Sequence, residues 1–508
     1  MNFYYTLQRN VDLYPDKVAW VDVFKEKRYT NVDFAARVSA LAAGLKMQGI
    51  RKGDRIAVLV YNCLECFEIF FAALKLGAVY VPVNFRLSAD EIAYVLNDAG
   101  ASALVSETEF VPLVDSVRSK LSVKDFLILD DATAEGWVNY ESVIKENRGA
   151  DFPYEETELD DLQRIMYTSG TTSHPKGAMI THGNLFWKCM AHILEFKLVP
   201  EDICLAIGPL YHAGGMDVTT TGVICIGGSV LVLRKFDPGV VLQTIEKEKV
   251  TIMWAAPIMM EMILDHPQFD QYDLSSWRTT PTGGAKSPLP LLQKTVRKFP
   301  QMRYLDGFGM TETVSADVVF DLLTRMDKSG SIGQIKKPVM FVRLRVVNEQ
   351  GQDCMPNEPG ELLVKGPKVF KGYWNNPVET AKALVDGWLH TGDIAVVDED
   401  GFIYLVDRKK DMIISGGENI GCLEVERVLD QHPKVLQSAV VGVQDEKWGE
   451  VPKAYVVLKP GEELTIQEVK SFCEGKLAHY KIPKFVEAID DLPKTTSGKV
   501  KKYELRRN

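Results

Sequence analysis

The stretch YTSGTTSHPKG, at residues 167–177, contains five Ser and Thr hydroxyls, two glycines and one lysine. Glycine lets backbone N–H groups come close to a ligand, hydroxyls donate hydrogen bonds, and lysine supplies a point charge, so the combination suits phosphate. It differs from the Walker pattern, because Lys176 is not preceded by Gly and no Ser or Thr follows it to hold Mg²⁺. A flexible polar loop is the alternative interpretation.

Three further segments carry residues that could handle a nucleotide. In YLDGFGMTET an aromatic between glycines could stack on a base, and Glu312 beside Thr311 could hold Mg²⁺. GWLHTGD ends in Asp393, whose oxygens suit a ribose diol, and Arg408 could support the same sugar or a phosphate. PKTTSGK ends in Lys499, which could move onto developing negative charge. Taken singly, each also has a structural interpretation: core aromatic, turn aspartate or surface lysine.

The elements that must position these residues alternate between strand-like and helix-like runs, which predicts an α/β fold. Ser88 and Glu91 form a capping box that starts one helix. After residue 400 a charged segment and a Gly-Gly turn separate a further α/β unit. We expect strands at 17–23, 54–62, 78–84, 101–106, 223–233, 250–257, 435–443 and 453–459, and helices at 32–50, 67–77, 422–432 and 466–480.

Length and composition limit the class of protein. The 508 residues are too many for one core, and 46% hydrophobic with 25% charged residues is ordinary for a globular protein. The net charge of −10 argues against nucleic acid as a partner. With no apolar run long enough for an integral membrane segment and no secretory pattern, we expect a cytoplasmic protein. Cys63 and Cys66 form an isolated CxxC, which we interpret as core residues rather than a zinc or redox pair.

Taken together and in this order, the motifs resemble those of the acyl-adenylate-forming superfamily, in particular the acyl-CoA synthetases. The resemblance covers the chain from about residue 1 to residue 508. The motifs that carry it are YTSGTTSHPKG, PLYHAGG, TGGA, YLDGFGMTET, YWNNPVETAKAL, GWLHTGD, DRKKDMIISGGENI and PKTTSGK.

The resemblance implies a large N-terminal domain at 1–409, made of several subdomains, and a small mobile lid domain at 410–508 that carries the catalytic lysine. It implies ATP, Mg²⁺ and coenzyme A as cofactors and a small carboxylic acid as substrate. The acid first attacks the α-phosphorus of ATP to give an acyl-AMP with release of pyrophosphate. The lid then rotates, and the CoA thiol attacks the activated carbonyl.

The resemblance also assigns roles to individual residues. Lys499, Thr311, Glu312, Lys176 and His212 are the implied catalytic set, with Glu312 as the ligand of Mg²⁺. Phe308 stands where many relatives have Tyr, so base stacking is kept without a phenolic hydroxyl. The implied ATP and CoA contacts are Thr168, Ser169, Gly170, Thr171, Thr172, Lys176, Gly283, Gly284, Ala285, Asp306, Gly307, Phe308, Thr311, Asp393, Arg408, Lys410, Gly416, Gly417 and Lys499.

The acid is less well defined by the sequence. No Arg or Lys occurs from 208 to 233, which disfavours a second carboxylate on the substrate. Asp217 could meet a substrate hydroxyl, although a solvent-facing side chain is the expectation we favour. The expected lining is His212, Gly214, Gly215, Met216, Gly283, Met310 and Val314.

These residues favour a medium-chain, aromatic or alicyclic monocarboxylic acid. A ligase that loads the phosphopantetheine of a carrier protein is one alternative. The other is a non-catalytic nucleotide-binding regulator on the same fold, against which the presence of both Glu312 and Lys499 argues.

Overall fold

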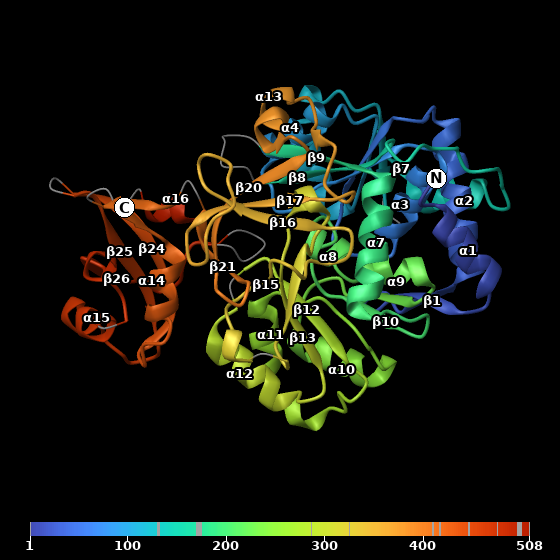
Figure 1. Ribbon diagram of the computed structural model, residues 1–508. Coiled ribbons are helices and arrows are strands. Elements are labelled where there is room, and N and C mark those ends of the chain that lie inside the picture. Colours follow the sequence, from blue (N-terminus) through green and yellow to red (C-terminus); the bar gives the residue numbers. More distant parts are fainter. Residues whose placement is uncertain are drawn as a thin grey trace.

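Two large sheets, with helices between them and on their outer faces, form the body of the molecule (Figure 1). The computed structural model describes residues 2–129, 133–168, 175–285, 287–324, 326–408, 411–415, 418–445, 448–474, 476–494 and 500–506. The mixed α/β class expected from the sequence is confirmed. None of the helices in this described part of the chain has the length and apolar character needed to cross a bilayer.

The first sheet has eight strands in the order β18-β9-β8-β4-β3-β5-β6-β7. Its centre is parallel, whereas β8 with β9 and β9 with β18 are antiparallel pairs. The strands are β3 (Arg55–Leu59), β4 (Val79–Pro82), β5 (Ala103–Ser106), β6 (Asp125–Ile128), β7 (Val138–Asn139), β8 (Leu162–Thr168), β9 (Lys176–Thr181) and β18 (Gly372–Tyr373).

The second sheet consists of two parts that meet at one residue. Ile252 forms parallel bridges to Cys204 on one side and to Thr279 on the other. It thereby joins the order β10-β11-β1-β2 to the order β12-β13-β14. The strands are β1 (Val18–Asp22), β2 (Lys27–Thr30), β10 (Ile203–Ala206), β11 (Ser229–Val232), β12 (Thr279–Gly283), β13 (Arg303–Phe308) and β14 (Val318–Asp321).

Three apolar cores arrange these sheets into layers. The core between the sheets takes side chains from both of them and from seven helices, while each outer face is covered by its own helices. Four of the seven inner helices are α2 (Asn31–Met47), α3 (Glu65–Lys75), α7 (His182–Phe196) and α9 (Thr220–Ile226). The outer ones are α4 (Ala89–Ala99) and α5 (Val111–Asp115) on the first sheet, and α10 (Pro238–Glu248), α11 (Pro257–Leu264) and α12 (Leu289–Lys298) on the second.

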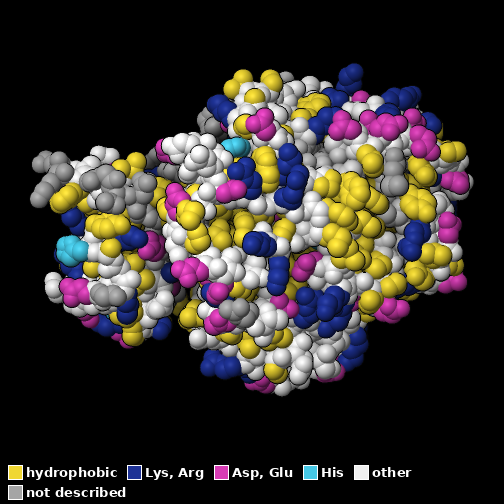
Figure 2. Space-filling model, viewed as in Figure 1, with side chains coloured by type: hydrophobic (Ala, Val, Ile, Leu, Met, Phe, Trp, Pro, Cys, Tyr) yellow, Lys and Arg dark blue, Asp and Glu magenta, His cyan; other side chains and the backbone are white. Residues whose placement is uncertain are grey.

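Two smaller sheets complete the chain. One contains β15 (Gly333–Gln334), β16 (Arg343–Val347), β17 (Gly360–Lys365), β19 (Leu384–Val385), β20 (Trp388–Val397) and β21 (Phe402–Arg408). The other contains β22 (Ile413–Ser415), β23 (Glu418–Ile420), β24 (Val435–Asp445), β25 (Gly449–Leu458) and β26 (Phe485–Ala488), with α14 (Cys422–Leu429) and α15 (Ile466–Cys473) on one face. Figure 2 shows this last unit as a separate lobe beside the body. The remaining helices are α1 (Tyr5–Leu13), α6 (Tyr140–Glu146), α8 (Ala213–Asp217), α13 (Pro377–Ala383) and α16 (Lys502–Leu505).

The expected elements are confirmed with two exceptions and one shortened helix. The capping box of Ser88 and Glu91 is present at the start of α4. The strand expected at 223–233 begins as helix α9 and becomes β11 only after Gly227, whose positive φ ends the helix. The strand expected at 250–257 is reduced to the bridges of Ile252, because Pro257 already starts α11. The helix expected at 466–480 ends at Cys473.

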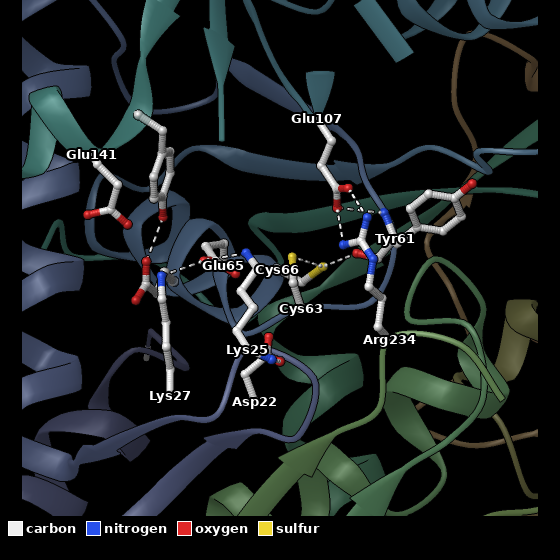
Figure 3. Close-up of polar contacts among 12 residues, drawn as sticks. Asp22, Lys25, Lys27, Tyr61, Cys63, Glu65, Cys66, Glu107, Glu141 and Arg234 are labelled. Atoms are coloured by element: carbon white, nitrogen blue, oxygen red, sulfur yellow. Dashed lines mark hydrogen bonds and ion pairs between the residues drawn. The ribbon is translucent and has the colours of Figure 1, made fainter. Parts of the chain in front are cut away.

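Cys63 and Cys66 lie around the N-terminus of α3, within a polar cluster (Figure 3). Both thiols are buried and their Sγ atoms lie 3.8 Å apart. Glu65 beside them accepts a hydrogen bond of 2.9 Å from Lys25. The described ranges contain no group of three or more His, Cys, Asp or Glu side chains that could hold a metal ion. The interpretation of this pair as buried core residues is confirmed.

A fully buried ion pair joins β8 to α8. Arg164 of β8 donates from Nη2 to Oδ1 of Asp217, the last residue of α8, at 2.9 Å, and both side chains are inaccessible to solvent. The expectation that Asp217 faces solvent was therefore wrong. No sequence pattern pointed to this pairing, because Arg164 is 53 residues away on another element.

We predict that Asp217→Ala destabilises the fold strongly, since it leaves the Arg164 guanidinium buried without its partner. Breaking a buried pair in this way costs about 3–5 kcal/mol. Urea unfolding followed by circular dichroism should show a lowered midpoint. Asp273→Ala, which breaks the exposed pair with Lys249, is the matched control and should leave the midpoint near that of wild type. A midpoint for Asp217→Ala equal to that of the control would contradict the prediction.

Candidate functional site

The hairpin of β8 and β9 fixes both ends of the expected phosphate loop. Thr168 and Lys176 are the last register pair of the two strands, and Thr168 Oγ1 donates to the Lys176 carbonyl at 3.4 Å. The residues between them that were expected to contact ATP, Ser169, Gly170, Thr171 and Thr172, lie outside the described residues. The hairpin therefore brings Thr168 and Lys176 side by side at one end of the β8–β9 pair.

Lys176 lies at the centre of a polar arrangement. Its Nζ is 3.0 Å from Oε2 of Glu379 on α13 and 4.4 Å from the centre of the Tyr373 ring. The Tyr373 hydroxyl donates to Oε1 of Glu312 at 2.8 Å. Burial, followed by the neighbouring Glu312 carboxylate, raises the pKa of Tyr373 far above its usual value, so this hydroxyl keeps its proton. Lys176 and Glu312, distant in sequence, are thus linked through one buried tyrosine.

Glu312 sits at the start of a tight turn with an unfavourable backbone. Val314 and Ser315 have φ values of 51° and 70°, a region that β-branched residues rarely adopt. Lys368 holds the turn: its Nζ donates to the carbonyl oxygens of Thr313, Ser315 and Ala316. The backbone carbonyl of Glu312 also accepts a bond of 2.7 Å from the N–H of Phe370. The orientation of Glu312 is therefore set from the segment that follows β17.

The segments expected at the adenine meet at the ends of two parallel strands, β12 and β13. Gly283 and Gly307 are register partners, and a Cβ on Gly283 would lie 2.6 Å from the Gly307 carbonyl oxygen. Ligands of parallel sheets bind at such carboxyl ends. Gly284 is exposed, whereas Phe308 is largely buried, with 9% of its surface exposed. Burial raises the pKa of the neighbouring Asp306 to about 7.

Asp393 and Arg408, which were expected to contact the same ligand, lie next to each other in the structure. They are cross-strand partners on β20 and β21, and Arg408 Nε lies 2.6 Å from Oδ1 of Asp393. Asp393 is buried, whereas Arg408 is partly exposed. A buried carboxylate oriented by a half-exposed guanidinium can present oxygen acceptors to a diol.

His212 caps α8, where its Nδ1 accepts a bond of 3.1 Å from the N–H of Gly214. The indole of Trp254 covers the glycines nearby. A Cβ on Gly214 would lie 2.8 Å from this indole, a Cβ on Gly208 would lie 2.5 Å from it, and one on Gly284 4.0 Å. Trp254 is thus packed between α8 and the end of β12, the two segments expected to border the acyl group.

Most of the expected site residues that the structure describes lie around the carboxyl ends of β12 and β13. Met216 and Val314 are fully buried, and Met310 and Thr311 are half-buried. The sequence did not point to Tyr373, Glu379, Lys368 or Trp254; the first two lie within the motif YWNNPVETAKAL, which was the available signal. The expected contacts Lys410, Gly416, Gly417 and Lys499 lie outside the described residues.

Comparison with known proteins identifies the family. Residues 7–374 match the AMP-binding enzyme family, and residues 424–499 match the AMP-binding enzyme C-terminal domain. The chain belongs to the AMP-binding enzyme family. It is an adenylate-forming acid–thiol ligase, and enzymes of this class use ATP, Mg²⁺ and coenzyme A. The resemblance to acyl-CoA synthetases drawn from the motifs is confirmed.

The relatives of this AMP-binding enzyme include several CoA ligases. It is 41% identical over 479 residues to a feruloyl-CoA synthase of Amycolatopsis sp, covering 94% of this chain and 93% of that protein. It is 36% identical over 500 residues to an indoleacetate–CoA ligase of Aromatoleum aromaticum, covering 98% and 96%. Among solved structures, the o-succinylbenzoate CoA synthetase of Bacillus subtilis with its acyl-adenylate intermediate gives a TM-score of 0.87 at 31% identity, covering 100% and 98% of the chains. An anthranilate CoA ligase bound to anthranoyl-AMP gives 0.90 at 27%, covering 100% and 97%.

We predict that Asp306 makes the stability of this AMP-binding enzyme fall with rising pH. The unfolded chain releases the Asp306 proton near pH 4, whereas the folded protein keeps it to about pH 7. Stability is therefore lost progressively between these two values and stays low above them. Asp306→Asn removes this loss, so it should be nearly as stable as wild type near pH 4 and more stable by about 4 kcal/mol at pH 8. Urea unfolding at several pH values tests this; a difference that does not change with pH would contradict it.

Proposed function

We propose that the enzyme converts an aromatic monocarboxylic acid into its CoA thioester through an acyl-AMP. The observation that carries the choice of an aromatic acid is the Trp254 indole, which lies against Gly208, Gly214 and Gly284. An indole packed against backbone offers a rigid apolar wall to an acyl group between α8 and the end of β12. Stacking of a second ring on such a wall contributes about 0.5–1.5 kcal/mol beyond burial.

Two further observations support an apolar, ring-bearing substrate. The glycines of α8 add no side-chain volume on the side of His212, and Met216 behind them is buried. Asp217, the charged residue of α8, is already paired with Arg164 inside the protein. The relatives named for ferulic, indoleacetic and anthranilic acids activate aromatic acids, which agrees with this choice.

For the nucleotide, we assign the phosphates of ATP to Thr168, Ser169, Thr171, Thr172 and Lys176, and the ribose to Asp393 and Arg408. The paired glycines of β12 and β13 leave room that a Cβ would fill, which suits close approach of a flat base beside Phe308. The Glu312 carboxylate supplies the hard oxygen ligand that Mg²⁺ prefers. Mg²⁺, when bound there, offsets negative charge on the phosphates.

The proposed reaction begins when an oxygen of the acid attacks the α-phosphorus of ATP and pyrophosphate leaves. Lys176 and Lys499 offset the charge that develops on the phosphates, and Thr311 contacts the α-phosphate. His212 lies at the mouth of the acyl site. In the second step Gly416 and Gly417 would guide coenzyme A to the acyl carbon. Its thiol sulfur bonds to that carbon, the thiol proton goes to solvent, and AMP leaves with the electron pair of the broken C–O bond. We propose that residues 410–508 form a lid that rotates between the two steps about Lys410.

We predict that Trp254 sets the preference for aromatic acids. With ATP, Mg²⁺ and CoA, wild type should form AMP and pyrophosphate, and its kcat/KM should be higher for aryl acids than for medium-chain aliphatic or alicyclic acids. Trp254→Leu should lower kcat/KM about 5- to 10-fold for aryl acids, because the stacking contact is lost, and leave aliphatic acids near wild type. Trp254→Phe is the matched control, since it keeps a ring.

An equal loss for every acid in Trp254→Leu would mean that the indole only supports the fold. Formation of ADP and orthophosphate by the wild-type enzyme would contradict the adenylation chemistry itself.

A second prediction concerns Lys499. Lys499→Ala should slow acyl-AMP formation about 10²- to 10³-fold, because it removes a donor used in that transition state. Given synthetic acyl-AMP and CoA, the variant should stay within about threefold of wild type, since this lysine is not used in thioester formation. Pyrophosphate release and thioester formation are measured separately. Equal loss in both steps indicates a misfolded lid, and normal rates in both exclude Lys499 from catalysis.

A further inference from the structure

Glu379 binds the lysine that we assign to the ATP phosphates. Its Oε2 lies 3.0 Å from Nζ of Lys176, and the two side chains are only 25% and 18% exposed. Its other oxygen, Oε1, accepts a hydrogen bond of 2.7 Å from Lys382, one turn further along α13. One carboxylate therefore bridges two ammonium groups, one of them at the site and the other, 69% exposed, at the surface.

The position of Glu379 is well determined by its surroundings. Asn376 caps α13 and accepts the backbone N–H of Glu379 at 3.1 Å. The helix is tied to β18, because Thr380 Oγ1 accepts the N–H of Tyr373 at 2.8 Å. Strand β18 in turn pairs with β9, which begins at Lys176. The carboxylate and the lysine are thus held opposite each other by the backbone of two neighbouring strands.

The pair borders open space. A cavity of about 430 Å³ is lined by Lys176 and Glu379 together with Trp374, Asn375 and Asn376. On the opposite side, Lys176 Nζ lies over the Tyr373 ring, whose hydroxyl reaches Glu312. The lysine stem is long and flexible, so its ammonium group can move between the cavity side and the Glu312 side while its backbone stays in the sheet.

One ammonium group cannot form a full ion pair with a carboxylate and with a nucleotide phosphate at the same time. If Lys176 serves the phosphates, its bond to Glu379 has to weaken as ATP binds and can form again when pyrophosphate leaves. Lys382 makes this exchange feasible, because it remains on Oε1 and keeps the released carboxylate paired. The neighbouring ammonium groups of Lys382 and then Lys176 hold the pKa of Glu379 below its usual value, so the carboxylate is charged throughout.

We infer that Glu379 is a positioning residue that holds Lys176 in the nucleotide-free enzyme and competes with the phosphates of ATP and pyrophosphate for it. The inference rests on the proposed assignment of Lys176 to those phosphates. It assigns Glu379 no contact with substrate: the residue acts through Lys176 alone. The competition weakens nucleotide binding and favours departure of pyrophosphate.

The test measures binding of Mg·ATP, and separately of Mg·pyrophosphate, by isothermal titration calorimetry without acid or CoA. In Glu379→Gln, which keeps the shape and the hydrogen bond but removes the charge, we expect both Kd values to fall about fivefold. Unchanged or raised Kd values would overturn the inference. Lys382→Gln, the matched control on the same helix, removes the other partner of Glu379; its Kd for Mg·ATP should be equal to or above that of wild type.

A double variant separates competition for Lys176 from simple charge repulsion. In the Lys176→Ala background, Glu379→Gln should no longer change the Kd of Mg·ATP, because the group through which it acts is gone. A fivefold effect that persists in this background would overturn the inference in favour of direct repulsion between Glu379 and the phosphates. If Lys176→Ala alone binds Mg·ATP as tightly as wild type, the assignment of Lys176 to the phosphates fails first, and the inference fails with it.

Discussion

A single buried ammonium group holds the turn on which the nucleotide site depends. The Lys368 ammonium group donates hydrogen bonds to three backbone carbonyls of this turn, those of Thr313, Ser315 and Ala316. It also forms an ion pair with Asp317 at 2.8 Å. Positive φ at two residues other than glycine costs about 1–3 kcal/mol each, so the turn persists because its surroundings fix it. Burial lowers the pKa of Lys368 and raises that of Asp317, and their mutual attraction opposes both shifts. This turn therefore sets the positions of Glu312 and Thr311.

Local rules predicted much of the fold from the sequence. Most of the strands and helices of the first 110 residues follow from apolar periodicity and from one capping box, whereas α1 and β2 were not expected. The errors arose where periodicity cannot distinguish two buried structures. Residues 223–226 are apolar on every side, so periodicity does not distinguish a strand from the buried helix that packs against α7. Ile252 bridges both parts of the second sheet without belonging to a strand of its own. This bridging depends on the assembled sheet rather than on the local sequence.

The site was predictable to the extent that its chemistry is carried by motifs. Asp393 with Arg408, and Gly283 with Gly307, are each brought together as register partners, although 15 and 24 residues separate them in sequence. The motifs could not predict with which neighbouring residue a long charged side chain pairs. The pairing of Lys176 with Glu379, and of Arg164 with Asp217, depends on which helix the fold places beside each strand. No spacing rule encodes that adjacency.

The backbone around Trp254 is held independently of its side chain. Ile252 accepts the N–H of Leu205 through its carbonyl, the N–H of Ala255 donates to the Pro281 carbonyl, and Thr282 Oγ1 donates to the Ala255 carbonyl. These main-chain bonds on either side of position 254 do not depend on which residue occupies it. Natural variation can therefore exchange this one side chain while the sheet stays intact. If Trp254 borders the acyl group as proposed, exchanging this one side chain can change which acid is accepted without rebuilding the framework around it.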